Sequence, residues 1–314
     1  MPDSPSESQA VPDSPTTVDT TFTPPSIILP AIHRSESYTH HSPIPPQLPE
    51  GTPCILGVDE AGRGPVLGPM VYAVAYLPAS QTHLLTSHGF DDSKKLTTAV
   101  RESLLKTTCT PGTDLHDWLG WSITSMSARD ISAGMLGTGK GYNLNAQAHD
   151  TTAQLIREVI ERGVNVTEIY VDTVGPPVTY QAKLQKLFPN SKVTVSKKAD
   201  SIYPIVSAAS VCAKVTRDVT IDVLAGEQEM GSGYPGDEKT KGWLKRERDP
   251  VFGWDARITR YSWRTVTDLL EKGDGPGVVW PDDDDEEGAR ITSFFGGSQE
   301  GGLAGWYGRP VLDF

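Results

Sequence analysis

Runs of apolar residues divide the middle of the chain into predicted strands and helices. Residues 54–59 and 70–77 are predicted to be strands, and the Gly/Pro turn between them favours antiparallel pairing. A helical pattern begins at Thr97, and residues 120–126 are predicted to form a third strand. This part of the chain therefore predicts an antiparallel sheet.

Farther along, the pattern changes to helices alternating with short strands. The predicted elements, in chain order, are a helix over 144–159, a strand over 168–173, a helix over 180–188, a strand over 192–196 and a helix over 203–224. Antiparallel strands followed by such alternation predict an α/β fold, a mixed sheet with flanking helices. No G-x-G-x-x-G opens a helix after the first strand, so the doubly wound dinucleotide-binding fold is not expected.

The two ends of the chain differ from this middle part. Half of the first 50 residues are Pro, Ser or Thr, so residues 1–49 are predicted to be a disordered arm that activity does not need. We divide the rest into a main domain over 50–230, a helical extension over 231–275 and a tail over 276–314. The tail carries six consecutive acids and then scattered aromatic residues, which indicates partner docking; folding back on the main domain is the alternative.

Charge and cysteine content narrow the function classes. The net charge of −12 lies in the ends, because residues 1–50 carry −5, residues 276–314 carry −6 and residues 51–275 only −1. The nearly neutral middle is therefore compatible with binding a polyanion. Three cysteines without a C-x-x-C pair argue against a disulfide framework and a zinc ribbon. No apolar stretch approaches 18 residues and no signal peptide is visible, so we expect an intracellular protein without a membrane span.

Four acidic residues stand at the ends of predicted elements. Asp59 and Glu60 follow the first strand, Asp172 ends a later strand, and Asp200 lies between a strand and a long helix. If the central strands are parallel, their carboxyl ends meet at one edge of the sheet. The plainer interpretations are a strand-end turn for Asp172 and a helix N-cap for Asp200.

Clustered carboxylates suit phosphodiester hydrolysis. Hard oxygen ligands favour Mg²⁺ or Mn²⁺, and two such ions are the usual arrangement for this reaction. The chain shows no H-E-x-x-H, no G-x-S-x-G and no P-loop, which disfavours zinc proteases, acyl hydrolases and P-loop nucleotide hydrolases.

Six segments together resemble the type 2 ribonuclease H family. In the family's order they are Asp59–Gly64, Asp92–Leu96, Tyr170–Gly175, Lys198–Asp200, Ser207–Asp218 and Gly231–Pro235. Their residues are most similar to the eukaryotic catalytic chain, usually called the A subunit, and the Pro/Ser-rich arm suits a fungal member. The resemblance covers about residues 54–265, and six collinear motifs are far more specific than one.

The resemblance implies roles for particular residues. The four acids Asp59, Glu60, Asp172 and Asp200 would be catalytic metal ligands for two Mg²⁺ or Mn²⁺ ions. Substrate-binding roles would fall to Gly62, Arg63 and Gly64, which would contact the ribose 2′-hydroxyl, to Tyr234, which would pack on the sugar, and to Lys94, Lys95 and Lys198, which would contact phosphate. For the tyrosine and the lysines, a turn residue and solvated side chains are the alternatives. Basic residues also interleave with aromatic ones over Lys239–Arg248 and then at Arg257, Arg260, Tyr261, Trp263 and Arg264, which suits either a duplex-binding platform or an amphipathic helix packed on the core.

The resemblance also implies an activity. We expect an endoribonuclease that hydrolyses the RNA strand of RNA:DNA hybrids and cuts 5′ of single ribonucleotides in duplex DNA, leaving 3′-hydroxyl and 5′-phosphate ends. The alternatives are a non-catalytic subunit that binds nucleic acid, or another nuclease of the ribonuclease-H-like fold. A heterotrimer with two non-catalytic subunits and a nuclear location, with the cytoplasm as a second one, are further implications.

Overall fold

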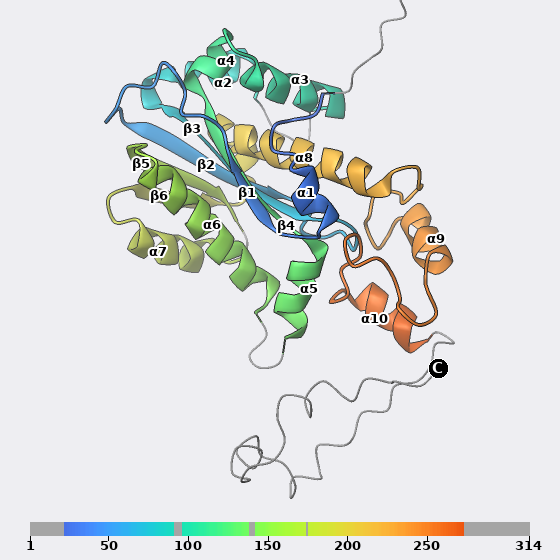
Figure 1. The fold of residues 1–314 in the computed structure, drawn as a ribbon. Coiled ribbons are helices and arrows are strands. Elements are labelled where there is room, and N and C mark those ends of the chain that lie inside the picture. Colours follow the sequence, from blue (N-terminus) through green and yellow to red (C-terminus); the bar gives the residue numbers. More distant parts are fainter. Residues whose placement is uncertain (1–21, 91–95, 138–141, 174, 273–314) are drawn as a thin grey trace, which may run out of the picture. The chain divides into compact units, whose positions relative to one another are not determined.

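Six strands of the described residues form one mixed sheet in the order β1-β4-β3-β2-β5-β6 (Figure 1). The computed structural model describes residues 22–90, 96–137, 142–173 and 175–272. The strands are β1 Tyr38–His41, β2 Cys54–Ala61, β3 Met70–Pro78, β4 Gly120–Met126, β5 Val166–Asp172 and β6 Lys192–Ser196. The first four pair antiparallel, whereas β2 with β5 and β5 with β6 pair parallel. The predicted mixed sheet is confirmed, and its parallel half is the half that carries Asp59 and Asp172.

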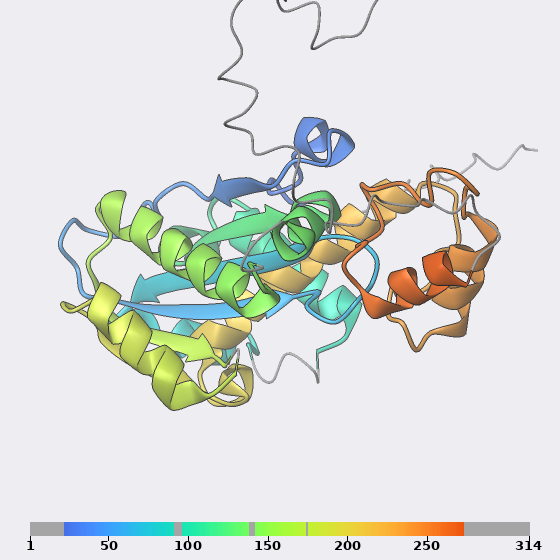
Figure 2. The same cartoon turned by 90° about the horizontal axis from the view of Figure 1, so that it is seen from below.

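Helices cover both faces of the sheet (Figures 1 and 2). One face packs on α8 (Pro204–Ala225), and α2 (His83–Ser87), α3 (Thr98–Cys109) and α4 (Asp114–Trp118) add to that layer. The other face packs on α5 (Ala128–Leu136), α6 (Leu144–Glu161) and α7 (Pro177–Leu187). Two 3₁₀ turns lie at Ala79–Gln81 and Ala199–Ser201. The result is a three-layer α/β arrangement.

Side-chain size along the central strand β3 differs between its two faces. Met70, Tyr72, Val74 and Tyr76 point toward α6, while the alternate residues, among them Ala73 and Ala75, point toward α8. Every residue of β3 is buried, as expected for a strand covered on both sides. Small residues on the α8 side leave room for this helix to lie close to the sheet.

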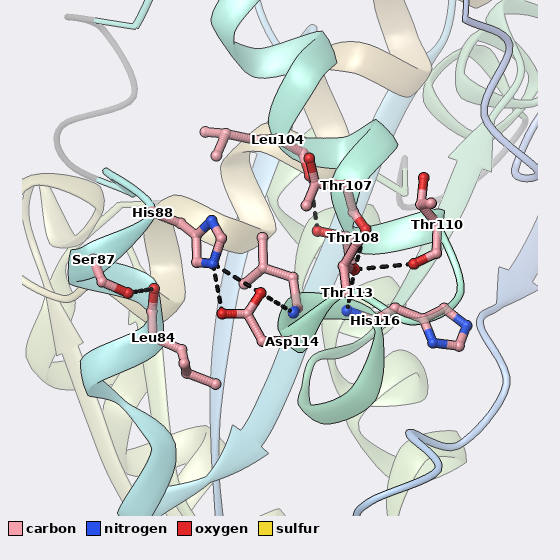
Figure 3. A network of polar contacts seen from close by, with 11 residues as sticks. Leu84, Ser87, His88, Leu104, Thr107, Thr108, Thr110, Thr113, Asp114 and His116 are labelled. Carbon is pink, nitrogen blue, oxygen red and sulfur yellow. Dashed lines mark hydrogen bonds and ion pairs between the residues drawn. The ribbon is translucent and has the colours of Figure 1, made fainter.

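Polar contacts fix the outer helices α2, α3 and α4 to one another (Figure 3). Thr113 begins α4: its Oγ1 accepts the N–H of His116 at 3.2 Å and donates to the carbonyl of Thr107 in α3 at 2.8 Å. The His88 ring, directly after α2, lies 2.8 Å from the Asp114 carboxylate, and this contact lowers the pKa of Asp114. The layer outside α8 is therefore held by helix caps as well as by apolar packing.

The predicted helical extension contains α9 (Glu238–Arg246) and α10 (Arg264–Glu271). Both helices share a separate apolar cluster with the turn between β2 and β3; its buried members are Val66, Leu67, Met230, Trp243, Leu244, Trp254, Ile258 and Val266. The extension is thereby anchored to the loop that follows Asp59 and Glu60, although it lies about 180 residues farther along the chain.

The prediction of disorder over residues 1–49 is wrong for residues 22–49. These residues form α1 (Leu29–His33), which buries Ala31 and Ile32, and the edge strand β1, which pairs with β4. The buried Ser26 Oγ lies 2.8 Å from Thr216 Oγ1 of α8. The segment is too polar to build a core of its own, but it adds to the edge of an existing sheet, and composition alone does not show that.

Other predictions have different outcomes. Residues 1–21 of the arm, Lys94, Lys95 and the tail 276–314 lie outside the described residues. Among the helices that the structure describes, none is long and apolar enough to cross a membrane. The predicted elements of the middle region are present with ends displaced by at most about three residues.

Candidate active site

The ends of two parallel neighbours, β2 and β5, bring Asp59 and Asp172 together. The register pairs Val58 with Val171, so the two aspartates follow a matched pair of residues. Because side chains alternate along a strand, both aspartates lie on the α8 face, opposite to these valines. Asp59 is buried at 6% exposure, and Asp172 is half-buried.

Glu60 lies at the same strand end but on the opposite face of the sheet. It shares that face with the buried rings of Tyr72 and Tyr180, and its charge raises the pKa of both phenols beyond the effect of burial. The Arg63 guanidinium opposes the rise in the pKa of Glu60. Arg63 itself donates a hydrogen bond from Nη2 to Oδ1 of Asn145, in the first turn of α6. The acids at the end of β2 therefore lie on both faces of the sheet, Asp59 toward α8 and Glu60 toward α6 and α7.

Asp200 joins this edge through the 3₁₀ turn after β6. Ser196 of β6 pairs with Asp172, and Asp172 Oδ1 accepts the N–H of Ala199 at 2.9 Å. Asp200 follows directly and is 4% exposed. The alternative of a helix N-cap is wrong, because Tyr203 occupies the N-cap of α8 and Asp200 lies one short turn earlier.

Electrostatics among the acids indicate a place for a cation. Burial raises the pKa of Asp59 to about 7, and the Asp172 carboxylate adds to the rise. Burial likewise raises the pKa of Glu60 to about 8, with a further contribution from Asp59. In the described part of the chain, no three His, Cys, Asp or Glu side chains already converge on one point as a metal site.

The donor set nevertheless fits a hard divalent cation. Carboxylates that repel one another at a buried edge are held ionised by a positive charge between them, and oxygen ligands suit Mg²⁺ or Mn²⁺. Bound to the four predicted ligands, such ions would remove the repulsion between Asp59, Glu60 and Asp172.

The loop Gly62–Gly64 leaves the end of β2 in a conformation that needs glycine. Gly62 has φ +84°, and a Cβ there would lie 2.7 Å from the carbonyl oxygen of Pro69 and nearer still to the Arg217 side chain. Larger residues at this position would strain the backbone and displace Arg217. The loop is therefore held close against Arg217 of α8, and its main chain is open at Gly64, which is exposed.

Tyr234, the other residue with a predicted substrate-binding role, lies next to this loop. A Cβ at Gly64 would be 3.2 Å from the Tyr234 ring, which is half exposed. Val66 N donates to the carbonyl of Gly233 at 2.8 Å, so the two loops are also joined through the main chain.

Side chains of the extension build the Tyr234 loop. The Asp237 carboxylate accepts the Ser232 N–H at 2.6 Å, and Thr240 Oγ1 accepts the Gly233 N–H at 2.9 Å. Sequence patterns did not identify Asp237 and Thr240. An acid three residues after Tyr234, directly before the basic segment 239–248, was the available signal for a cap that also holds the loop.

The remaining predicted contacts have mixed outcomes. Lys198 is exposed beside Asp200 and adopts a left-handed conformation with φ 56°, which is rare for a residue with a side chain. Arg260, predicted to lie in a duplex-binding platform or a packed helix, does neither: it lies outside the helices and is completely buried at 0% exposure. The platform interpretation is therefore wrong for this residue.

The sheet order and the acidic strand ends define a nuclease of the ribonuclease-H-like class, and comparisons with known proteins specify it further. The model of the family Ribonuclease HII matches residues 56–266. The A subunit of ribonuclease H2 from Neurospora crassa is 52% identical over 92% of this chain and 95% of its own length. The A subunit of ribonuclease H2 from Homo sapiens is 47% identical over 81% and 85%.

A solved structure shows the same relationship. The ribonuclease H2 from Pyrococcus horikoshii OT3 aligns with a TM-score of 0.60 and 31% identity, covering 69% of this chain and 97% of that one. The chain belongs to the ribonuclease HII family. It is accordingly a ribonuclease H enzyme, an endoribonuclease that acts on RNA in RNA:DNA hybrids.

Proposed function

We propose that the enzyme also cuts duplex DNA on the 5′ side of a single embedded ribonucleotide, leaving 3′-hydroxyl and 5′-phosphate ends. The observation that supports this best is the position of the Gly62–Gly64 loop, which joins the acidic end of β2 directly to the Tyr234 loop. A scissile phosphate at the carboxylates would place the adjoining sugar at these loops. One ribose would then be enough for recognition.

Asp59, Glu60, Asp172 and Asp200 would hold two divalent cations at the end of the sheet. Bound there, the cations would supply Lewis acidity to the phosphodiester and lower the pKa of the attacking water. The protein's own part is to keep the four carboxylates at the edge and to orient the substrate. Water adds to phosphorus, the bond from phosphorus to the upstream 3′-oxygen breaks, and that oxygen takes up a proton.

Tyr234 and the glycine loop would give the specificity for ribose. The half-exposed ring can pack on the sugar while its edge rests on Gly64. A site that hydrogen-bonds a hydroxyl rejects an analogue that lacks it, because its own polar groups then stay unpaired. Lys198, and Lys94 and Lys95 outside the described residues, remain candidates for phosphate contact.

The direct test is cleavage of an end-labelled DNA duplex that contains one ribonucleotide. With Mg²⁺ or Mn²⁺ we expect a single cut 5′ of the ribonucleotide, and Asp172→Asn should lower its rate by orders of magnitude with an unchanged unfolding transition. The experiment is run with and without the candidate partner subunits. Failure to cut under all these conditions would overturn the proposed cleavage at a single ribonucleotide, and metal-dependent cutting at all-DNA positions would support another nuclease activity.

Relatives that are named as one lettered subunit of ribonuclease H2 imply an assembly of several subunits. We therefore propose that the enzyme works in a heterotrimer with two non-catalytic subunits. In this assembly the aromatic tail 288–314 would dock on a partner subunit, and the complex would be located in the nucleus. Removing residues 288–314 should weaken recovery of the partners in a pull-down while Mg²⁺-dependent cleavage of a hybrid remains. Undiminished recovery would contradict tail docking, and a fluorescent fusion excluded from the nucleus would contradict the location.

A further inference from the structure

Arg260 is a buried cation without a carboxylate partner. It has 0% exposure, and within the described residues it forms no ion pair. Burial lowers its pKa to about 9. An unpaired cation in the interior is costly, so its remaining contacts must satisfy it.

The guanidinium is satisfied by main-chain carbonyls of the loop after β2. Nη2 donates to the carbonyl of Gly62 at 2.7 Å, Nη1 to that of Arg63 at 3.4 Å and Nε to that of Gly68 at 2.8 Å. Trp263 carries the guanidinium on its ring, 4.7 Å from the centroid. One side chain thus holds three carbonyls of a single loop.

Because the peptide bond is planar and trans, these carbonyl contacts fix the direction in which two N–H groups point. In a trans peptide the C=O of one residue and the N–H of the next point in opposite directions. When the carbonyls of Gly62 and Arg63 point inward to Arg260, the N–H groups of Arg63 and Gly64 must point outward. Within the described residues neither of these two amides donates a hydrogen bond.

We infer that Arg260 is the positioning residue of the sugar-reading loop: it turns two carbonyls inward and thereby presents the amides of Arg63 and Gly64 to a hydroxyl oxygen of the substrate. This inference rests on the proposed function. Arg260 touches no substrate and acts through the loop main chain, with its charge behind the two donors favouring an electronegative ligand.

Main-chain hydrogen bonds hold the segment of Arg260 firmly against the loop. Its own N–H donates to the carbonyl of Val66 at 2.9 Å, and Gly68 N donates to the carbonyl of Ile258 at 2.6 Å. Residues 258–260 therefore pair with the loop through hydrogen bonds on both sides of Leu67, which lies opposite Thr259. A lysine at this position has one ammonium group and cannot reach three carbonyls in the fork geometry of arginine.

Trp263 offers a matched control, because it also contacts a carbonyl of the same loop. Its Nε1 donates to the carbonyl of Gly64 at 3.1 Å, but the next residue is Pro65, which has no N–H to aim. Trp263→Phe removes this hydrogen bond and keeps an aromatic ring beside Arg260. It should lower stability without changing the orientation of the two amides.

The test compares the affinity of two duplexes, one with a single ribonucleotide and one all-DNA, in an Asp172→Asn background that prevents cleavage. We expect Arg260→Lys to lower the ribonucleotide-to-DNA affinity ratio about tenfold, as for one mis-aimed hydrogen bond, and Trp263→Phe to leave the ratio unchanged. If Arg260→Lys does not fold, Arg260→Gln, which is neutral and keeps a donor amide, takes its place.

The outcomes separate the inference from the proposed function. If the parent protein itself binds both duplexes equally, the proposed ribose recognition fails. If the parent prefers the ribonucleotide and the Arg260 variant keeps that preference, or if Trp263→Phe loses as much of it, only the positioning role fails. A purely structural arginine would weaken both affinities together and leave their ratio intact.

Discussion

Gly57 allows the first turn of α8 to lie directly on β2, and Gly57→Ala should show how strongly this contact controls the site. A Cβ at Gly57 would lie 2.6 Å from the backbone nitrogen of Val206 and nearer still to the carbonyl of Ile205. Reaching an ordinary contact of 3.4 Å requires α8 and β2 to separate by about 1 Å, because both opposing groups are backbone and cannot rotate away.

The expected losses follow from that displacement. Overpacking of this kind costs typically 1–3 kcal/mol, and we place Gly57→Ala at about 3 kcal/mol, at the upper end of that range. Asp59 lies two residues farther along β2, and a shift of about 1 Å in a catalytic group lowers the rate about a hundredfold. Urea unfolding measures the first quantity, and single-turnover cleavage of a hybrid, at a temperature where the variant is folded, measures the second.

Gly242 provides the control for Gly57→Ala. It lies in α9, is exposed, and a Cβ there would have no neighbour within 4 Å. Gly242→Ala should therefore raise the free energy of unfolding by about 0.5–1 kcal/mol, because alanine loses less backbone entropy in a helix. Wild-type stability and rate in Gly57→Ala would refute the argument that α8 is seated on this glycine.

Three further predictions concern metal, the arm and the tyrosine. Because the folded pKa values of Asp59 and Glu60, about 7 and 8, exceed their ordinary values of 3.8 and 4.5, the metal-free protein should lose stability as pH rises from about 4 to 8. Mg²⁺ replaces the protons, so the Tm gain on adding it should grow over the same range in scanning calorimetry; a gain that shrinks would contradict a site at these acids. Deleting residues 1–49 should cost at least about 3 kcal/mol in urea unfolding, since it removes β1 and buried side chains of α1, whereas deleting 1–21 should cost nothing measurable. Tyr234→Ala should impair cleavage at a single ribonucleotide more than cleavage of a long hybrid, and equal losses would reduce the residue to a turn.

The parts of the fold predictable from sequence are those in which one residue pattern has one physical solution. The apolar run over residues 70–77 predicted a strand, and the structure shows β3 there, buried along its whole length between two helical layers. Asp59 and Asp172 were placed together because the ends of parallel neighbours meet, and the register of Val58 with Val171 confirms it. Local patterns fail for β1, whose four half-buried polar residues become a strand only when β4 offers an edge.

Arg260 shows the second kind of limit. An arginine among aromatic residues is typical of a nucleic-acid surface, and only the tertiary structure reveals that this one is buried against carbonyls from residues almost 200 positions earlier. Sequence patterns carry no information about such a contact, because a main-chain carbonyl can accept a hydrogen bond whatever its side chain is. Asp200 is similar, since its distance from the start of α8 follows from a 3₁₀ turn that no pattern marked.

Two kinds of rigidity meet at the end of β2, and they have different origins. The acids depend on close packing of α8 against small residues of the sheet, so their geometry responds to changes in the core such as Gly57→Ala. The Gly62–Gly64 loop depends instead on the apolar cluster of the extension and on the carbonyl contacts of Arg260. Both supports use α8, but Gly57 contacts its first turn, whereas the loop contacts Arg217 farther along the helix, so damage to one support should leave the other largely intact. A core variant should therefore lose turnover while keeping ribose preference, and an Arg260 variant should lose ribose preference while its acids still respond to Mg²⁺.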